Sequence, residues 1–309
     1  MDDSILQLFP AKDRVFWRYT ASCQKEIREI RLRVGRPIVL YRQREEFFLT
    51  EEGSLTKCVT QAHLVAEREL KELLEHICRY SIYAYEQELS QGYLTVCGGH
   101  RIGVAGQVVT ESLNEIRTIK NISFMNIRIA HEIKGVADNV LSALYEEGAL
   151  KNTLIISPPG CGKTTLLRDL IRQVSNGNQY GRGRTVGVVD ERSELAGCFQ
   201  GIPQNDLGMR TDVLDGCPKA LGMMLLLRSM SPEVIAVDEI GSEKEMEELK
   251  RASSCGCILL ATAHGVNMED VQRRFALEKE VWSALFQRVV VLRRRKGSCY
   301  ISEVKKIGD

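Results

Sequence analysis

A glycine-rich stretch in the second half of the chain has the residue types that bind phosphate. Residues 155–165 read IISPPGCGKTT, which nearly matches the phosphate-loop pattern G-x-x-x-x-G-K-[ST], with Ser157 in place of the first glycine. That position opens the loop rather than contacting phosphate, and the two prolines that follow it stiffen the turn. The residues expected to bind the nucleotide are Pro159, Gly160, Cys161, Gly162, Lys163, Thr164 and Thr165.

Several of these residues have defined roles if the loop binds a nucleotide. Lys163 would reach the β- and γ-phosphates, and the Thr164 hydroxyl would ligate Mg²⁺. Gly160 and Gly162 would let the backbone approach the phosphates, and the helix that follows would present its free N–H groups to the anion. The same string could occur by chance in a surface loop, so the motif needs support from elsewhere in the chain.

An apolar segment with an acidic end supplies this support. Residues 234–239 read VIAVDE, the pattern of a buried strand that ends in two carboxylates. Asp238 would hold Mg²⁺ through water, and Glu239 would polarise the attacking water as a general base. Alone, the segment could also be a buried strand whose acidic end begins a solvated loop. Together with the phosphate loop, it predicts a P-loop nucleoside-triphosphate hydrolase.

Two further strand ends should lie beside that site, because ligands collect at the carboxyl ends of parallel strands. One carries Asp190, Glu191 and Arg192, and the other carries Thr262 and His264. A polar residue there can sense the γ-phosphate through a hydrogen bond. The alternatives remain open, because His264 could be an ordinary loop histidine and the two carboxylates could cap a strand end.

The elements around these residues alternate between strand and helix. Short apolar strands between amphipathic helices indicate a parallel sheet covered on both faces. The tail 288–304 is expected to form a hairpin that finishes the sheet, with Lys296 and Gly297 at its turn. The other expected strands are 152–157, 185–190, 233–239 and 257–263, and the expected helices are 163–174, 218–230 and 243–253.

The first half has a mixed pattern of helix and strand. Residues 29–34 alternate apolar and charged side chains, which is typical of a half-buried strand. A long segment, 62–80, has leucines at helical spacing, and a helix over about 132–148 leads to the second half. Further strands are expected at 37–41, 46–50, 92–97, 101–109 and 121–130, with a tight turn at 98–100. We therefore expect an α+β N-terminal domain over 1–135 and a P-loop ATPase domain over 136–309.

Composition limits the classes of function. A formal net charge of +1 gives no global attraction to nucleic acid or anionic lipid. No apolar run approaches the length of a membrane span, and the N-terminus lacks the order of a signal peptide, so we expect a cytoplasmic protein. Most of the ten cysteines are expected to be structural thiols, because only Cys255 and Cys257 lie close together and their spacing is not that of a zinc pair.

These motifs together resemble the type II/IV secretion ATPases. Residues 223–249 are similar to their leucine–arginine helix, Walker B strand and following helix, 188–195 to their acidic box, and 261–265 to their histidine box. The strand at 29–37 is similar to the one that opens their N-terminal domain. The strings GYLTVCGGHRIGVAG and RTDVLDGCPKA resemble more closely a branch of this family that acts in endospore formation.

The resemblance implies a fold, an activity and partners. The fold is a RecA/AAA-like P-loop domain with a mainly parallel sheet, preceded by a smaller α+β domain. The activity is ATP hydrolysis with Mg²⁺ by a homo-oligomeric ring, expected to be a hexamer. This ring would energise a secretion-like channel between mother cell and forespore, as a peripheral protein on the cytoplasmic face of membrane channel proteins of the sporulation complex.

The resemblance also assigns roles to individual residues. Glu191 takes the acidic-box role, Glu239 the role of the Walker B glutamate, and His264 that of the histidine box. The sequence departs from the family in two places. Asp238 stands where the family often has glycine, which makes the metal site more like that of general AAA enzymes, and a glycine follows His264 where the family has alanine.

Ring ATPases usually complete each site with an arginine from a neighbouring domain or subunit, which stabilises charge in the transition state. The candidates are Arg101, Arg128 and Arg210. Arg101 is preferred because the two glycines shortly before it would present it on a turn of the N-terminal domain. Each of the three could also be an ordinary surface charge.

Two other functional classes compete with this interpretation. A nucleic-acid-dependent motor would use the same core, but the neutral charge and the 6% aromatic content leave little for base stacking. A small-molecule kinase would need a second substrate pocket and a lid that carries arginine. The basic run 293–296 could touch phosphates, although such a run more often keeps a strand edge solvated.

Overall fold

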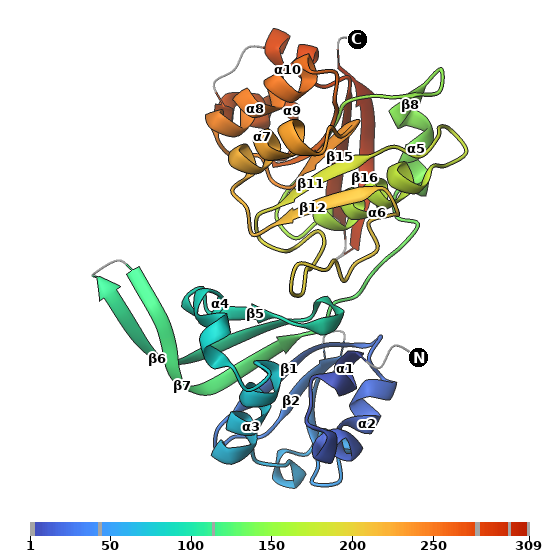
Figure 1. Cartoon of the computed structure of the whole chain (residues 1–309). Coiled ribbons are helices and arrows are strands. Elements are labelled where there is room, and N and C mark those ends of the chain that lie inside the picture. Colours follow the sequence, from blue (N-terminus) through green and yellow to red (C-terminus); the bar gives the residue numbers. More distant parts are fainter. Residues whose placement is uncertain (1–3, 43–44, 113–114, 276–278, 296–297, 308–309) are drawn as a thin grey trace. The chain divides into compact units, whose positions relative to one another are not determined.

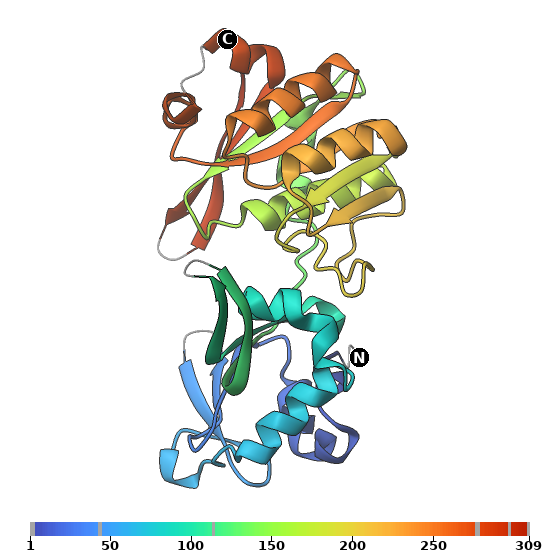
Figure 2. The ribbon, with the colours of Figure 1, turned by 60° about the vertical axis from the view of Figure 1, so that its left-hand side comes forward.

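The computed structural model describes residues 4–42, 45–112, 115–275, 279–295 and 298–307. Contacts divide the chain into two compact units. The first comprises the residues up to His131 together with Gly197–Gln204, and the second comprises Glu132–Ala196 and the residues from Asn205 onward (Figures 1 and 2). The loop Gly197–Gln204 thus packs with the first unit although it lies within the sequence of the second.

The first unit is built on a seven-stranded sheet in the order β4-β3-β2-β1-β7-β6-β5. Every pair of neighbouring strands is antiparallel. The strands are β1 Ile27–Arg33, β2 Val39–Arg42, β3 Glu45–Leu49, β4 Leu55–Thr56, β5 Tyr93–Thr95, β6 Arg101–Ser112 and β7 Glu115–Arg128. The α-helices are α1 Ser4–Gln7, α2 Arg14–Ser22, α3 Glu67–Ile77 and α4 Glu86–Ser90, and short 3-10 turns lie at Ala11–Asp13, Val59–Gln61, Ile82–Tyr85 and Cys97–Gly99.

The core of the first unit follows from the expected apolar patterns. In β1 the buried residues Ile30 and Leu32 alternate with partly exposed ones, as the period of a half-buried strand requires. The helix α3 turns Leu70, Leu73 and Ile77 into the same core. This helix begins at Glu67 and not at residue 62, because the residues before it are extended and bond to the strands.

The second unit contains a seven-stranded sheet in the order β12-β11-β13-β14-β10-β15-β16. All its pairs are parallel except the last, in which β15 and β16 run antiparallel. The predicted mainly parallel α/β fold is therefore confirmed. Its strands are β10 Thr153–Ser157, β11 Val186–Asp190, β12 Thr211–Asp215, β13 Val234–Val237, β14 Ile258–His264, β15 Arg288–Arg295 and β16 Ser298–Lys306.

Helices cover both faces of this sheet. Figure 1 shows α7, α8 and α9 on one face and α5 and α6 on the other. The central strands β10 and β13 are buried along their whole length, as strands covered on both faces must be. The helices are α5 Asp138–Leu144, α6 Lys163–Asn176, α7 Lys219–Ser229, α8 Glu243–Ser254, α9 Met268–Phe275 and α10 Lys279–Leu285.

The segment 132–148 differs from the predicted long helix. Only α5 is helical, and a small hairpin of β8 (Tyr145–Glu146) and β9 (Ala149–Leu150) follows it. The turn residues Glu147 and Gly148 both have positive φ angles, 50° and 77°, which a two-residue hairpin turn requires and a helix excludes. The C-terminal hairpin is present as predicted, whereas its expected turn at Lys296 and Gly297 lies outside the described residues.

Candidate nucleotide site

The phosphate-loop motif lies between a buried strand and the start of a helix. β10 ends at Ser157, and α6 begins at Lys163. Gly160 and Gly162 have φ angles of 67° and 84°, a region that residues with a side chain rarely adopt. The loop therefore has the strand–turn–helix context that a phosphate loop needs, and a helix N-terminus attracts anions.

The serine in place of the first glycine is accommodated without an unpaired polar group. Ser157 is fully buried, and its hydroxyl donates a hydrogen bond of 2.8 Å to the carbonyl oxygen of Pro158. A buried hydroxyl is costly only when it lacks a partner. The substitution is thus compatible with the turn at the entrance of the loop.

Lys163 connects the loop to the end of a neighbouring strand. Its side chain is buried, with 6% of the residue exposed. The ammonium nitrogen lies 2.8 Å from His264 Nδ1 and 3.5 Å from the carbonyl oxygen of Ser157. Burial lowers the pKa of Lys163, and the negative charges of Asp238 and Glu239 oppose that shift. The lysine and the histidine that the sequence places 101 positions apart therefore share one contact.

The two hydroxyls nearest Asp238 come from two different elements. Thr164 at the start of α6 donates to Asp238 Oδ2 at 2.6 Å, and Thr262 of β14 donates to Asp238 Oδ1 at 2.5 Å. Among the described residues no group of three His, Cys, Asp or Glu side chains could hold a metal ion. Mg²⁺ usually binds one or two carboxylates with waters and phosphates, so Thr164 and Asp238 have the oxygen chemistry that fits this ion.

Glu239 lies just beyond β13 in an uncommon backbone conformation. Its φ angle is 54°, in the left-handed region where residues other than glycine are infrequent and often functional. Its Oε1 lies 2.8 Å from His264 Nε2, and its Oε2 lies 3.6 Å from Arg192. Because Lys163 donates to Nδ1, the ring nitrogen that faces the glutamate at ion-pair distance is Nε2. His264 thus links the loop lysine to the candidate general base.

The acidic pair at the end of β11 has two different roles. Asp190 is buried and accepts hydrogen bonds from the backbone N–H groups of residues 194, 195 and 196, while burial raises its pKa. Asp190 therefore organises the loop that follows it. Glu191 forms an ion pair of 3.1 Å with Lys219, and the Lys219 ammonium also donates to the backbone carbonyl of Glu239 at 2.9 Å. Lys219 thus connects Glu191 to Glu239, just beyond the end of β13.

A cavity of about 680 Å³ opens beside the loop within the second unit. Its walls are mostly apolar. They come from the segment before α5 and the start of that helix, from the phosphate loop and the start of α6, and from the C-terminal hairpin. An apolar cavity beside a phosphate loop suits the base and ribose of a nucleotide. The lining residues are Ile133, Val136, Asn139, Cys161, Gly162, Thr165, Leu166, Leu292, Cys299, Tyr300 and Ile301.

Known proteins resemble this chain in sequence and in fold. Residues 1–307 match the family described as sporulation stage III, protein AA. The chain belongs to this family. The stage III sporulation protein AA of Bacillus subtilis is 43% identical over 279 residues, which cover 90% of this chain and 86% of that protein. The protein SEEDLING PLASTID DEVELOPMENT 1 of Arabidopsis thaliana is 28% identical over 55% of this chain and 25% of its own length.

Solved structures with the fold of this sporulation-family chain include an ATPase and a pilus motor. The ATPase DotB of Legionella pneumophila has a TM-score of 0.61 at 16% identity, covering 96% of this chain and 81% of that chain. The pilus retraction motor PilT with bound ADP has a TM-score of 0.64 at 15% identity, covering 96% and 83%. The predicted type II/IV secretion ATPase-like fold is therefore confirmed.

The three candidate arginines lie in different surroundings in this family member. Arg101 and Arg128 face each other across β6 and β7 of the first unit, and the Arg101 guanidinium lies over the Tyr93 ring, 3.6 Å from its centroid. Arg210 donates to the carbonyl oxygen of Ser175 at 2.9 Å, near the C-terminal end of α6. The Arg210 guanidinium is thus bound at the opposite end of α6 from Lys163.

Two residues near the loop escaped the sequence-based prediction. Lys219 belonged to no functional motif, although it lies within the string RTDVLDGCPKA at residues 210–220. Arg294 belongs to the basic run interpreted as a solvated edge, yet its guanidinium donates to the Gly160 carbonyl oxygen at 2.7 Å.

No helix among the described residues is both long and apolar enough to cross a membrane.

Proposed function

We propose that this member of the sporulation family hydrolyses ATP with Mg²⁺. The observation that carries the proposal is two adjoining sets of contacts. In one, Lys163 meets His264 and His264 meets Glu239; in the other, Thr164 meets Asp238. These side chains come from the phosphate loop and from the ends of β13 and β14, where ligands of parallel sheets collect. Chance proximity would not bring a lysine, a base and a metal-binding pair to one edge.

Each of these side chains has a step to perform. Lys163 binds the β- and γ-phosphates, and Asp238 with Thr164 holds the metal, which when bound neutralises charge on the phosphate oxygens. Glu239 orients a water and accepts its proton. His264 contacts both Lys163 and Glu239. Loss of the γ-phosphate from Lys163 would therefore alter the position of Glu239 through the His264 imidazole. Glu191, through Lys219, orients the backbone of Glu239.

We further propose that the chain works as a homo-oligomeric ring, expected to be a hexamer, on the cytoplasmic side of a sporulation membrane channel. Membership in the sporulation family and the fold shared with DotB and PilT support this. In this assembly Arg101 of a neighbouring copy would stabilise the charge of the transition state. The bound cofactors would be ATP and Mg²⁺, and the partners the membrane channel proteins.

The proposal is tested by measuring phosphate release from ATP over protein concentrations that span assembly. Lys163→Ala is expected to abolish release, because the phosphates lose their main cationic contact. The exposed Lys244→Ala on α8 is the matched control and should hydrolyse like the wild type. Equal release by Lys163→Ala and wild type would refute the site. Stimulation by DNA or RNA would favour the nucleic-acid-dependent motor, and a phosphorylated product would favour a kinase.

A further inference from the structure

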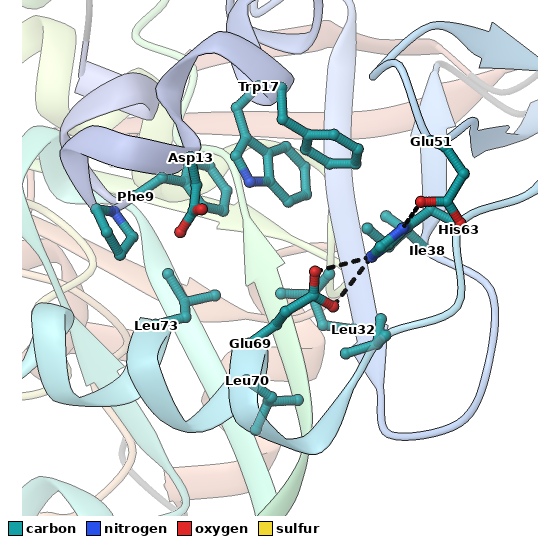
Figure 3. A pocket seen from close by; sticks show the side chains of 13 residues that line it. Phe9, Asp13, Trp17, Leu32, Ile38, Glu51, His63, Glu69, Leu70 and Leu73 are labelled. Carbon is teal, nitrogen blue, oxygen red and sulfur yellow. Dashed lines mark hydrogen bonds and ion pairs between the residues drawn. The ribbon is translucent and has the colours of Figure 1, made fainter.

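The first unit contains a separate cavity of about 240 Å³. It lies between the N-terminal helical segment and α3 (Figure 3). Its walls are largely apolar: Phe9 and Trp17 stack with centroids 3.9 Å apart, and Leu70 and Leu73 of α3 form the opposite side. Such walls would fit the aliphatic part of a ligand side chain.

Acidic groups also reach this cavity. His63 is hydrogen-bonded to Glu51 at 2.7 Å and to Glu69 at 3.0 Å. Burial lowers the pKa of His63, but the two glutamates outweigh it and the pKa is raised. The third carboxylate, that of Asp13, is partly buried in the lining and forms no hydrogen bond or ion pair with any residue that the structure describes. Since His63 can balance only one of three carboxylates, the cavity favours a cation.

An unpaired donor faces the same space. Trp17 is 5% exposed, and its indole N–H has no hydrogen-bond partner among the described parts of the chain. Figure 3 shows the indole nitrogen on the side of the ring toward Asp13 and Glu69. The N–H is open to the cavity and is not sealed in the core, so an oxygen that enters the cavity can accept from it. The cavity thus offers carboxylates for a cation and one donor for an oxygen.

We propose that this cavity binds an arginine or lysine residue of a partner polypeptide. The aliphatic stem of the residue packs against Leu70, Leu73 and the Phe9–Trp17 pair. Its charged end meets Asp13 and Glu69, and its own backbone carbonyl accepts the Trp17 indole N–H. A simple amine or guanidine lacks that carbonyl, so the indole donor selects a peptide over a small cation.

The experiment is a fluorescence titration of the full-length chain. Trp17 and Trp282 are its two tryptophans, and Trp282→Phe leaves Trp17 as the reporter. The probe is N-acetyl-leucyl-arginyl-leucine amide, the matched control is its glutaminyl analogue, and agmatine supplies the cation alone. Calorimetric titration of the unsubstituted chain gives the same affinities should Trp282→Phe fold poorly.

We expect the arginyl peptide to bind at least about tenfold more tightly than the glutaminyl peptide, since a charged hydrogen bond to a carboxylate is lost in the latter. Asp13→Asn should remove most of that difference, whereas Glu75→Gln, on α3 but outside the lining, should not. Equal binding of the two peptides, or an unchanged preference in Asp13→Asn, would overturn the proposal. Agmatine binding as tightly as the arginyl peptide would overturn its polypeptide part.

Discussion

Asp238 and Glu239 are neighbours in sequence, yet their side chains serve different groups. The Asp238 carboxylate accepts from Thr164 and Thr262, while Glu239 contacts His264. The positive φ angle of Glu239 turns the chain between them, and the Glu239 N–H is held by the Thr262 hydroxyl at 2.8 Å. In the proposed mechanism, this turn would allow one dipeptide to provide both an oxygen for the metal and a general base.

Replacing Glu239 by glutamine should slow ATP hydrolysis without weakening ATP binding. Lys163 and Thr164 are untouched, so the affinity for a fluorescent ATP analogue should remain near that of the wild type. Phosphate release should fall about 10²–10⁴-fold, the usual contribution of a general base. Glu243→Gln, exposed at the start of α8, serves as the control. Near-normal release by Glu239→Gln would remove this residue from the role of base.

At the scale of elements, the C-terminal hairpin bears directly on the phosphate loop. Arg294 of β15 donates to the Gly160 carbonyl oxygen, and the Cys299 thiol of β16 lies 3.6 Å from the same atom. Cys299 is exposed and lines the 680 Å³ cavity. The hairpin is therefore a wall of the candidate nucleotide site as well as the edge of the sheet.

Nucleotide should protect Cys299 from alkylation. A ligand in the cavity would cover the thiol, so its reaction with iodoacetamide, followed by peptide mass spectrometry, should slow several-fold when ATP and Mg²⁺ are added. Cys58 of the first unit is exposed, and a hydrogen bond to Thr60 lowers its pKa; its rate should not change. Unchanged labelling of Cys299 would argue against a nucleotide in that cavity.

The elements that sequence reasoning found were those with a strong apolar period and clear ends. The strands leading to Ser157 and Asp238 are buried throughout, and they could be predicted together with the helices α6 and α7 between them. β12 could not, because this edge strand is only partly buried and shows no clear alternation. The motifs marked the loop and its acidic partners, whereas Lys219 and Arg294 act through contacts with backbone carbonyls, and such contacts leave no pattern of spacing in the sequence.

At the scale of the whole molecule, ion pairs connect distant parts of the second unit. Glu146 in β8 accepts from Lys306 at 2.8 Å and from Arg288 at 3.2 Å, which tie it to both strands of the C-terminal hairpin. Hydrogen bonds from Lys306 and Arg288 lower the pKa of Glu146 from its ordinary value of 4.5 to about 2. The carboxylate therefore stabilises the folded chain in its ionised form.

The stability of Glu146→Gln should depend on pH differently from that of the wild type. A depressed folded pKa gives stability that is complete above the unfolded value of 4.5 and is lost as pH falls toward about 2. Urea unfolding should thus show the variant less stable at pH 7 and the gap closing below pH 4.5. Glu147→Gln, its exposed neighbour, is the control. A gap that stays constant down to pH 2 would contradict the assignment.

If neighbouring chains of a ring share active sites, mixing two inactive variants should restore part of the activity. Arg101→Ala should bind ATP normally but release little phosphate, and Lys163→Ala should be inactive. Mixed in equal amounts, the two should regain roughly a quarter of wild-type activity, because a site then joins an intact Lys163 to an intact Arg101 in one pairing of four. If the mixture stays as inactive as its parts, Arg101 does not complete a neighbouring site.

If Lys163 binds phosphate as proposed, its contact with His264 makes that binding an exchange of partners. The lysine ammonium already has an acceptor in the histidine ring, so a phosphate that binds Lys163 takes the place of a hydrogen bond that the protein made for itself. The net affinity is then lower than an unpaired ammonium would give. The imidazole of His264, released from Lys163 but still in contact with Glu239, would then change its hydrogen bonding when phosphate binds. The end of β14 would thereby respond to the phosphate. The Lys163–His264 contact would thus lower the affinity for phosphate and couple phosphate binding to the position of His264.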